Sequence, residues 1–255
     1  MTFELVVFLM GVGLVGGAWN AVAGGATLFT FPALMIAGLP PVTANATNYL
    51  AMLPSNAAAL PAYRRELAGV GGAIWPLLLV SGLGAIVGSV LLLVSGQATF
   101  EILIPFLILA ATLLFAFGDR LRQMMLDVTK GQSADGMLYA ALFAFSIYGG
   151  YFGAGLGIIL LAIVQIMGFS SFHVANSVKN LLAASFTILS IFVFGLGGII
   201  AWPEALVMMS GSTLGGYLGG RYSRLVNEVY LRAGVIGFGF ILTAVYFIRL
   251  SGGIH

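Results

Sequence analysis

The sequence predicts an all-α integral membrane protein built from two inverted-topology repeats. Three observations predict this class. Hydrophobic residues make up 60% of the 255 residues and charged residues only 7%, whereas a soluble domain carries roughly 25% charged residues. The apolar residues form stretches long enough to cross a bilayer. The motifs of the first half of the chain recur, in the same order, in the second half.

Composition also excludes several classes of site. The chain has no cysteine, which excludes disulfides and thiolate metal sites. Its two histidines, His173 and His255, are too few for a His-rich zinc site. No Ser-His-Asp set and no paired carboxylates occur, so we expect no enzyme, no metal and no cofactor. The net charge of +2 gives no support for nucleic-acid binding.

Apolar segments follow one another in two series of five. A span needs about 20 residues, and roughly six of the segments are that long. The first segment lacks the basic start of a secretory signal, so we expect it to remain in the membrane. The first series covers about 4–23, 26–38, 43–62, 70–94 and 100–118, and the second about 137–152, 155–168, 173–196, 203–220 and 231–250.

The first two segments of each series form a special pair, at 4–38 and 137–168. Each pair contains glycines, is too long for one helix, and has a second piece that is short for a full crossing. We therefore expect four to five helical segments per repeat, with a Gly-broken or re-entrant first helix. The expected organisation is a first transmembrane repeat at 1–118, a polar linker loop at 119–136 and a second repeat at 137–255.

The two series share motifs at matching positions. The stretch Ala44–Leu50 (ANATNYL) corresponds to Ala175–Leu181 (ANSVKNL). The further matches are Gly16-Gly17 with Gly149-Gly150, Gly71-Gly72 with Gly197-Gly198, Trp75-Pro76 with Trp202-Pro203, and Gly84 and Gly88 with Gly215 and Gly219. Several matches in one order indicate that the halves are copies of one helical unit.

Basic residues indicate that the copies are inverted. The connection after the third segment is basic in the first half and not in the second, whereas the connection after the fourth segment shows the reverse. The residues concerned are Arg64 and Arg65 in the first half, and Arg221, Arg224 and Arg232 in the second. Because basic loops stay in the cytoplasm, equivalent connections are expected on opposite sides of the membrane.

The same rule orients the whole chain. The linker carries Arg120, Arg122 and Lys130, so we expect it in the cytoplasm and both termini outside. Inverted repeats with broken helices are typical of secondary transporters, whose substrate site lies near the bilayer midplane where the repeats meet.

Lys179 is the residue that points most directly to a substrate. It lies within the apolar segment 173–196, and no carboxylate accompanies it at that depth. A charged residue at the centre of a membrane helix costs about 3 kcal/mol, so it needs a partner, and an anionic substrate would serve. Asn176 and Asn180 share its helical face. The alternative is a lysine that extends to the membrane interface or bonds helix-end carbonyls.

The first half offers a corresponding polar face, formed by Asn45, Thr47 and Asn48. Amide and hydroxyl groups can donate hydrogen bonds to an oxyanion. We therefore expect the two polar faces to meet at the repeat interface and bind the substrate. The alternative is that these side chains only bond neighbouring helices, which is common in membranes.

The glycine breaks offer a backbone site. Gly24 and Gly25 in the first half, and Gly153 and Gly155 in the second, can expose backbone N–H groups and helix N-termini, which attract anions. The alternative reading is close helix packing.

Several ordered motifs resemble the TauE/SafE sulfite exporter family. They are the Gly-rich first segment ending in Phe31-Pro32, Gly38–Pro41, Ala44–Asn48, Tyr63–Glu66 and His173–Leu181. The resemblance covers nearly the whole chain. It implies tandem related halves and movement of sulfite, sulfoacetate or related organosulfur anions across the bacterial cytoplasmic membrane.

We therefore expect a multi-pass protein of the bacterial cytoplasmic (inner) membrane. It would be a secondary transporter that exports a small anion, sulfite or an organosulfonate, by alternating access. Its partners would be the anion and the lipid bilayer, and a homo-oligomer is compatible with the sequence. The alternatives are an anion channel, a membrane-embedded enzyme, for which no chemistry is found, and a non-transporting membrane subunit.

Overall fold

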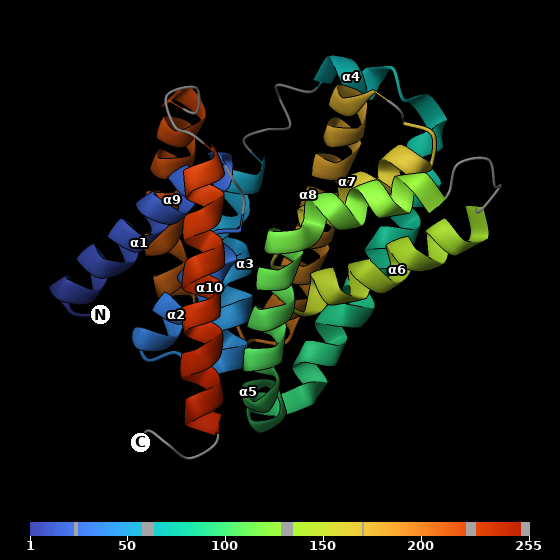
Figure 1. Ribbon diagram of the computed structural model, residues 1–255. Coiled ribbons are helices and arrows are strands. Elements are labelled where there is room, and N and C mark those ends of the chain that lie inside the picture. The colour runs from blue at the N-terminus through green and yellow to red at the C-terminus, as the bar shows by residue number, and fades with distance from the viewer. Residues whose placement is uncertain (23–24, 58–63, 129–134, 170, 223–227, 251–255) are drawn as a thin grey trace.

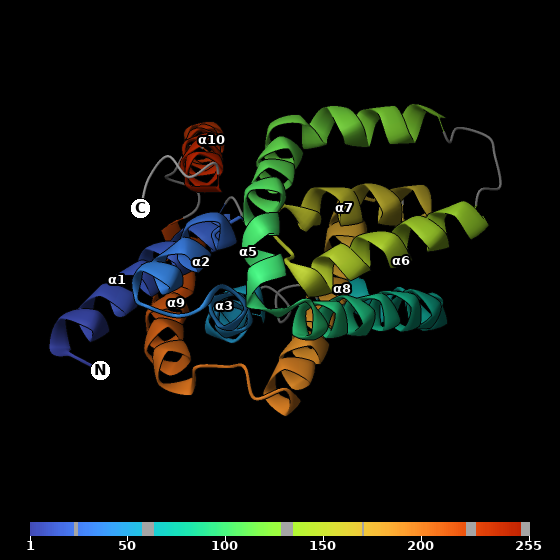
Figure 2. The ribbon, with the colours of Figure 1, turned by 90° about the horizontal axis from the view of Figure 1, so that it is seen from below.

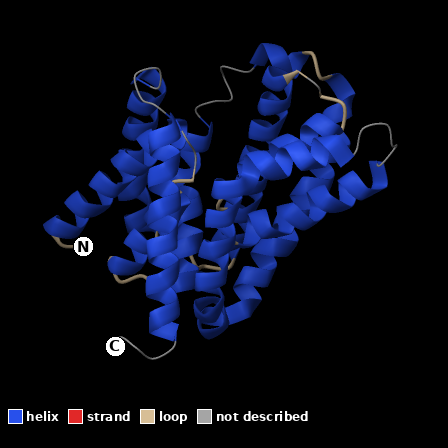
Figure 3. Ribbon diagram, in the orientation of Figure 1, coloured by secondary structure: helices blue, strands red, loops and turns tan. Residues whose placement is uncertain are grey.

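A computed structural model describes residues 1–22, 25–57, 64–128, 135–169, 171–222 and 228–250. Within these ranges every regular element is a helix and no strand occurs (Figure 3). The prediction of an all-α protein is therefore confirmed. Four helical stretches in the described part are long and apolar enough to cross a membrane: Phe3–Asn20, Gly71–Leu121, Val174–Leu196 and Ala233–Leu250.

The helices follow the predicted segments closely. In the first half they are α1 (Phe3–Val22), α2 (Thr27–Ile36), α3 (Pro41–Ala57), the short α4 (Arg64–Ala68), the 3-10 turn η2 (Gly71–Ala73) and α5 (Ile74–Val128). In the second half they are α6 (Asp135–Tyr151), α7 (Leu156–Ile166), α8 (Phe172–Leu196), α9 (Trp202–Tyr222) and α10 (Glu228–Leu250).

The long helix α5 is two helices joined by one residue. Gly96 has φ +70° and ψ 167°, which is not helical, and the chain reverses there (Figure 1). We call residues 74–95 the first arm and residues 97–128 the second arm. The second arm corrects one expectation, because the predicted loop at 119–136 begins as helix and stays helical to Val128.

The expected breaks in the first helix of each half are present. Between α1 and α2, Gly25 has φ +77°, and between α6 and α7, Gly153 and Gly155 have φ +75° and +78°. Glycine adopts such angles without the steric cost that other residues meet. With 10 and 11 residues, α2 and α7 are each about 15 Å long, roughly half of the hydrocarbon thickness.

The helices form two groups (Figures 1 and 2). One group contains α1, α2, α3 and α9, with α10 beside α2, and the other contains α5, α6, α7 and α8. The most extensive contact of α10 is nevertheless with α5. Each group thus combines the first three segments of one half of the chain with the last two of the other half. The groups meet where α3 contacts α8 and where the second arm of α5 contacts α10.

Glycines allow the closest helix contacts in both groups. A Cβ added to Gly13 or Gly17 of α1 would overlap the backbone of α9. A Cβ added to Gly88 would overlap the backbone of α6, and one added to Gly84 would come 2.7 Å from Phe143 O. Such small-residue contacts are the main way in which membrane helices approach each other.

Three arginine-bearing elements share one end of the molecule, whereas Arg249, in the last turn of α10, lies toward the other end. In Figure 1, α4, the far end of α5 and the far end of α9 all lie in the upper part of the view. The Gly96 turn lies at the opposite end, beside the start of α3, where Val42 N donates to Gln97 Oε1 at 2.8 Å. The connection between α8 and α9 reaches the same region, since Ala201 N donates to Thr47 Oγ1 at 3.0 Å.

Candidate functional site

One face of α3 lies between the two helix breaks. Asn45 Nδ2 donates to the carbonyl of Tyr151, the last residue of α6, at 2.9 Å. One turn later, Asn48 Nδ2 donates to Oγ1 of Thr27, the first residue of α2, at 3.4 Å. Both asparagines are buried, with exposed fractions of 0% and 2%. The predicted polar face of the first half therefore touches both broken helices.

The second arm of α5 covers both breaks from another side. A Cβ on Gly25 would overlap the ring of Phe115, and a Cβ on Gly155 would come 3.1 Å from Ala111 O and 3.3 Å from Leu114 Cβ. Since residues 111 to 115 form about one helical turn, the two breaks converge on one short stretch of α5.

Side chains satisfy the carbonyl groups freed at the α6 break. The donors come from α3, from the first arm of α5 and from α6 itself. Tyr49 Oη donates to Gly149 O and Tyr148 Oη to Ala154 O at 2.7 Å. Ser89 Oγ shares its single hydrogen between Ala85 O at 2.8 Å and Gly150 O at 3.3 Å. Buried backbone groups need such partners, so these donors hold the break in place. None of these three donors was predicted from the sequence, although Tyr49 directly follows the polar face formed by Asn45, Thr47 and Asn48.

The short helices α2 and α7 begin without side-chain caps. Their N-cap residues are Ala26 and Gly155, neither of which has a side-chain acceptor. In α2, however, Leu28 N and Phe29 N already donate to the carbonyls of Gly25 and Ala26, at 3.1 and 3.0 Å. The capacity of a helix start to bind an anion therefore applies to α7 more than to α2. The predicted backbone site at Gly25, Gly153 and Gly155 stays a prediction, and Gly24 lies outside the described residues.

Thr47 points away from the breaks. Its Oγ1 accepts the hydrogen bond from Ala201 N, just beyond the end of α8. Close by, the ring of Tyr49 packs against Phe194 with centroids 5.4 Å apart. The start of α3 thus lies beside the end of α8, and the two helices run in opposite directions.

Lys179 lies near the other end of α8. The helix is continuous from Phe172 to Leu196, so Asn176, Lys179 and Asn180 share one face as expected, and all three are partly buried. The neighbouring residues on α8 belong to an apolar cluster with α7, which contains Val178, Leu182, Ile159, Leu160 and Ile163. No carboxylate in the described part of the chain forms an ion pair with Lys179.

The two predicted polar faces do not meet in this structure. Fifteen residues separate Lys179 from Phe194, which is about 22 Å along a helix axis, and Phe194 is the residue that contacts Tyr49. Lys179 and Asn48 each lie seven residues after the start of their helix, but these helices start at opposite ends of the molecule. The structure therefore brings Asn45 and Asn48 together with both glycine breaks, and leaves Lys179 apart.

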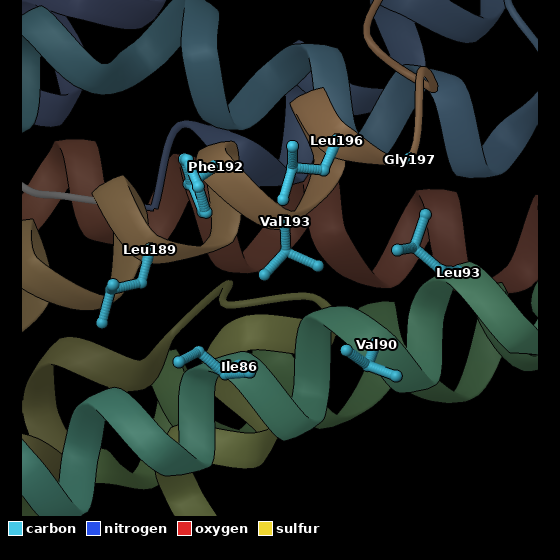
Figure 4. Close-up of a pocket in the computed structure, with 8 residues that line it drawn as sticks. All are labelled: Ile86, Val90, Leu93, Leu189, Phe192, Val193, Leu196 and Gly197. Carbon is cyan, nitrogen blue, oxygen red and sulfur yellow. The ribbon is translucent and has the colours of Figure 1, made fainter.

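A separate groove lies between the first arm of α5 and α8 (Figure 4). Its volume is about 470 Å³, and it is lined by Ile86, Val90, Leu93, Leu189, Phe192, Val193, Leu196 and Gly197. No lining side chain is polar. Phe192 and Leu196 are 64% and 76% exposed, so this groove belongs to the apolar outer surface and offers no side-chain donor to an anion.

Comparisons with known proteins cover almost the whole chain. A family model described as "Sulfite exporter TauE/SafE" matches residues 9–246. A "Probable membrane transporter protein" of Haemophilus influenzae is 34% identical over 244 residues, which is 94% of each chain. The "Probable membrane transporter protein ORF9" of a Sinorhizobium species is 29% identical, over 88% of this chain and 85% of that protein. The "Probable membrane transporter protein YfcA" of Escherichia coli K12 is 27% identical, over 94% and 88%. No solved structure matches significantly.

Proposed function

Because the chain belongs to the TauE/SafE sulfite exporter family, we propose that it exports a small anion, sulfite or an organosulfonate, as a secondary transporter working by alternating access. Membership of this family confirms the resemblance of the sequence motifs and makes the chain a membrane transporter and not an enzyme. The nature of the anion and the mode of transport are our proposal.

The environment of Lys179 is the main support for an anionic substrate. Its side chain is partly buried in α8 beside an apolar cluster, and no described carboxylate pairs with it. An ammonium group at that depth is stabilised when an anion binds beside it. Asn176 and Asn180 lie on the same face and would donate hydrogen bonds to the anion's oxygens.

The α3 residues belong to a later part of the proposed path. Asn45 and Asn48 use their amide hydrogens within the protein, and Thr47 holds the connection after α8. They could bind the anion only in another conformation, in which these bonds are exchanged for bonds to the substrate. The uncapped start of α7 would bind the anion as it passes between the two ends.

Two features of the arrangement support inverted repeats. Each helix group combines three segments of one half with two of the other, which is what a pseudo-twofold axis between the halves would produce. Equivalent connections also lie at opposite ends, because the chain leaves α3 toward α4 at the upper end of Figure 1 and leaves α8 toward α9 at the lower end.

The same arrangement supports the proposed orientation. The arginine-bearing ends of α4, α5 and α9 would face the cytoplasm. Both termini would lie outside the bacterial inner membrane, as predicted from the sequence. Lys179 would then lie in the cytoplasmic half, about 10 Å from the start of its helix. That position suits the capture of an anion that is to be exported.

Purified protein tests the anion site directly. Thermal unfolding is measured with sulfite, sulfoacetate, thiosulfate and short carboxylates for wild type, Lys179→Ala and Lys179→Arg. Loss of one charge-assisted contact should weaken binding by about 10- to 100-fold, whereas arginine should retain part of it. The matched control is Thr187→Val, since among the described residues the Thr187 hydroxyl bonds only Ala183 O of its own helix.

The result would contradict the proposal if Lys179→Ala kept the full anion-dependent stabilisation. Proteoliposomes then separate a carrier from a channel. A carrier gives saturable flux and accelerated exchange when unlabelled anion is present on the far side, while a channel gives neither.

A further inference from the structure

The same face of α3 carries two buried oxygen atoms with no hydrogen bond. They are Asn45 Oδ1 and Asn48 Oδ1, and neither has a partner among the described residues. Buried polar atoms are nearly always bonded, so an unbonded pair on adjacent turns needs an explanation, and an ion is one of the few available.

Hydrogen bonding fixes the direction of the Asn45 amide. The carbonyl of Tyr151 can only accept, so the atom facing it at 2.9 Å must be the Asn45 nitrogen. The Asn45 oxygen therefore points elsewhere, into the protein. Asn48 lies one turn further on the same face, and at this spacing two side chains stand about 5 to 6 Å apart at Cβ and can reach one ligand.

We propose that this face of α3 binds a monovalent alkali cation through Asn45 Oδ1 and Asn48 Oδ1, between the two helix breaks. Oxygen atoms of amides, hydroxyls and carbonyls are the usual ligands of hard cations. Thr27 Oγ1 and the second lone pair of the Tyr151 carbonyl lie next to the asparagines and can complete the ligand set.

The lack of acidic residues around the site favours a monovalent cation over a divalent one. Helices α2, α3 and α7 contain no Asp or Glu, so a divalent cation would lack the carboxylates that normally balance it. In the present conformation, in which the amide hydrogens are bonded within the protein, the two free acceptor oxygens also repel an anion. The α3 face and Lys179 thus become complementary sites, about 20 Å apart along α8.

The role of the bound cation in transport rests on the proposed function, whereas the existence of the cation site does not. A cation bound where both broken helices meet would link a cation gradient to anion movement, since α2, α3 and the α6–α7 break would move together when it binds. Binding itself requires no anion and can be measured without one.

The experiment is thermal unfolding of the purified full chain in NaCl, KCl, LiCl or choline chloride at equal ionic strength, with no substrate anion. We expect at least one alkali cation to raise Tm by about 3 °C or more above choline at saturation. Asn48→Ala and Asn45→Ala should each shift the half-saturating concentration upward at least tenfold. Thr187→Val should leave the cation response unchanged.

The readout is the difference in Tm between an alkali chloride and choline chloride for the same variant. A variant that is less stable in every salt therefore remains informative. Lys179→Ala should keep the cation response while losing the anion response, which separates this proposal from the previous one. Equal Tm in all four salts for wild type would overturn the cation site, as would an unchanged response in both asparagine variants. Neither result would bear on the anion.

Discussion

Tyr49 connects the two halves of the chain through one side chain. Its hydroxyl donates to the carbonyl of Gly149 in α6, and its ring packs edge-on against Phe194 in α8. The residue is 7% exposed. Because the hydroxyl satisfies a carbonyl at the helix break, Tyr49 sets the distance between α3 and the last turn of α6.

Tyr49→Phe should therefore destabilise the protein more than removal of a surface hydroxyl would. It leaves a buried carbonyl without its donor, which costs about 1 to 3 kcal/mol. We expect a lower Tm in detergent. Tyr151→Phe is the control, since that hydroxyl bonds the partly exposed Ser95 at 3.2 Å. Equal losses in the two variants would show that the Gly149 contact has no special weight.

Residue types in the sequence were enough to identify Lys179, Asn45 and Asn48 as buried polar groups. They could not give the distance between the two faces, because α3 and α8 have equivalent motifs but run in opposite directions. Nor could residue types show which atoms of the Asn45 and Asn48 amides form hydrogen bonds within the protein. That depends on Tyr151 and Thr27, which lie far away in sequence.

At the scale of helices, glycine determines which pairs approach most closely. Gly13 in α1 faces the backbone of Met208 in α9, while Gly11, two residues earlier, has no atom within 4 Å of an added Cβ. The two glycines differ by about 200° around one helix, given 3.6 residues per turn. They form a matched pair for testing the contact.

Gly13→Ala should force α1 and α9 apart and destabilise the protein by about 1 to 3 kcal/mol. Gly11→Ala should be neutral or stabilising by up to about 1 kcal/mol, since alanine favours a helix. Thermal unfolding of both variants measures the difference. A Gly13 variant as stable as the Gly11 variant would argue against the close α1–α9 packing.

The helix breaks were predictable and the end of α5 was not. Glycines at 25, 153 and 155 adopt positive φ, which other residues rarely do, so a glycine cluster inside an apolar stretch indicates a break. Charged residues begin at Asp119, but most residues of 119–128, including arginine, leucine, methionine and glutamine, favour helix. Polarity indicates where a helix leaves the apolar region, not where it ends.

At the scale of the whole molecule, the proposed orientation can be tested because the natural chain has no cysteine. Ala68 at the end of α4 and Ala98 just after Gly96 are both exposed and lie at opposite ends. In spheroplasts, a membrane-impermeant thiol reagent should label Ala98→Cys and not Ala68→Cys. Lysis should expose both. The reverse pattern would invert the orientation, and labelling of both in intact spheroplasts would place the two ends on the same side.

The single-residue reversal at Gly96 limits how the helix groups can move. A connection of one residue cannot lengthen, so the two arms of α5 cannot slide past each other along the membrane normal. The first arm packs on α6 and the second arm also contacts α10 of the other group. An elevator motion, in which one group travels vertically against the other, would have to shear that second contact. A rocking motion that pivots near the Gly96 turn would preserve it.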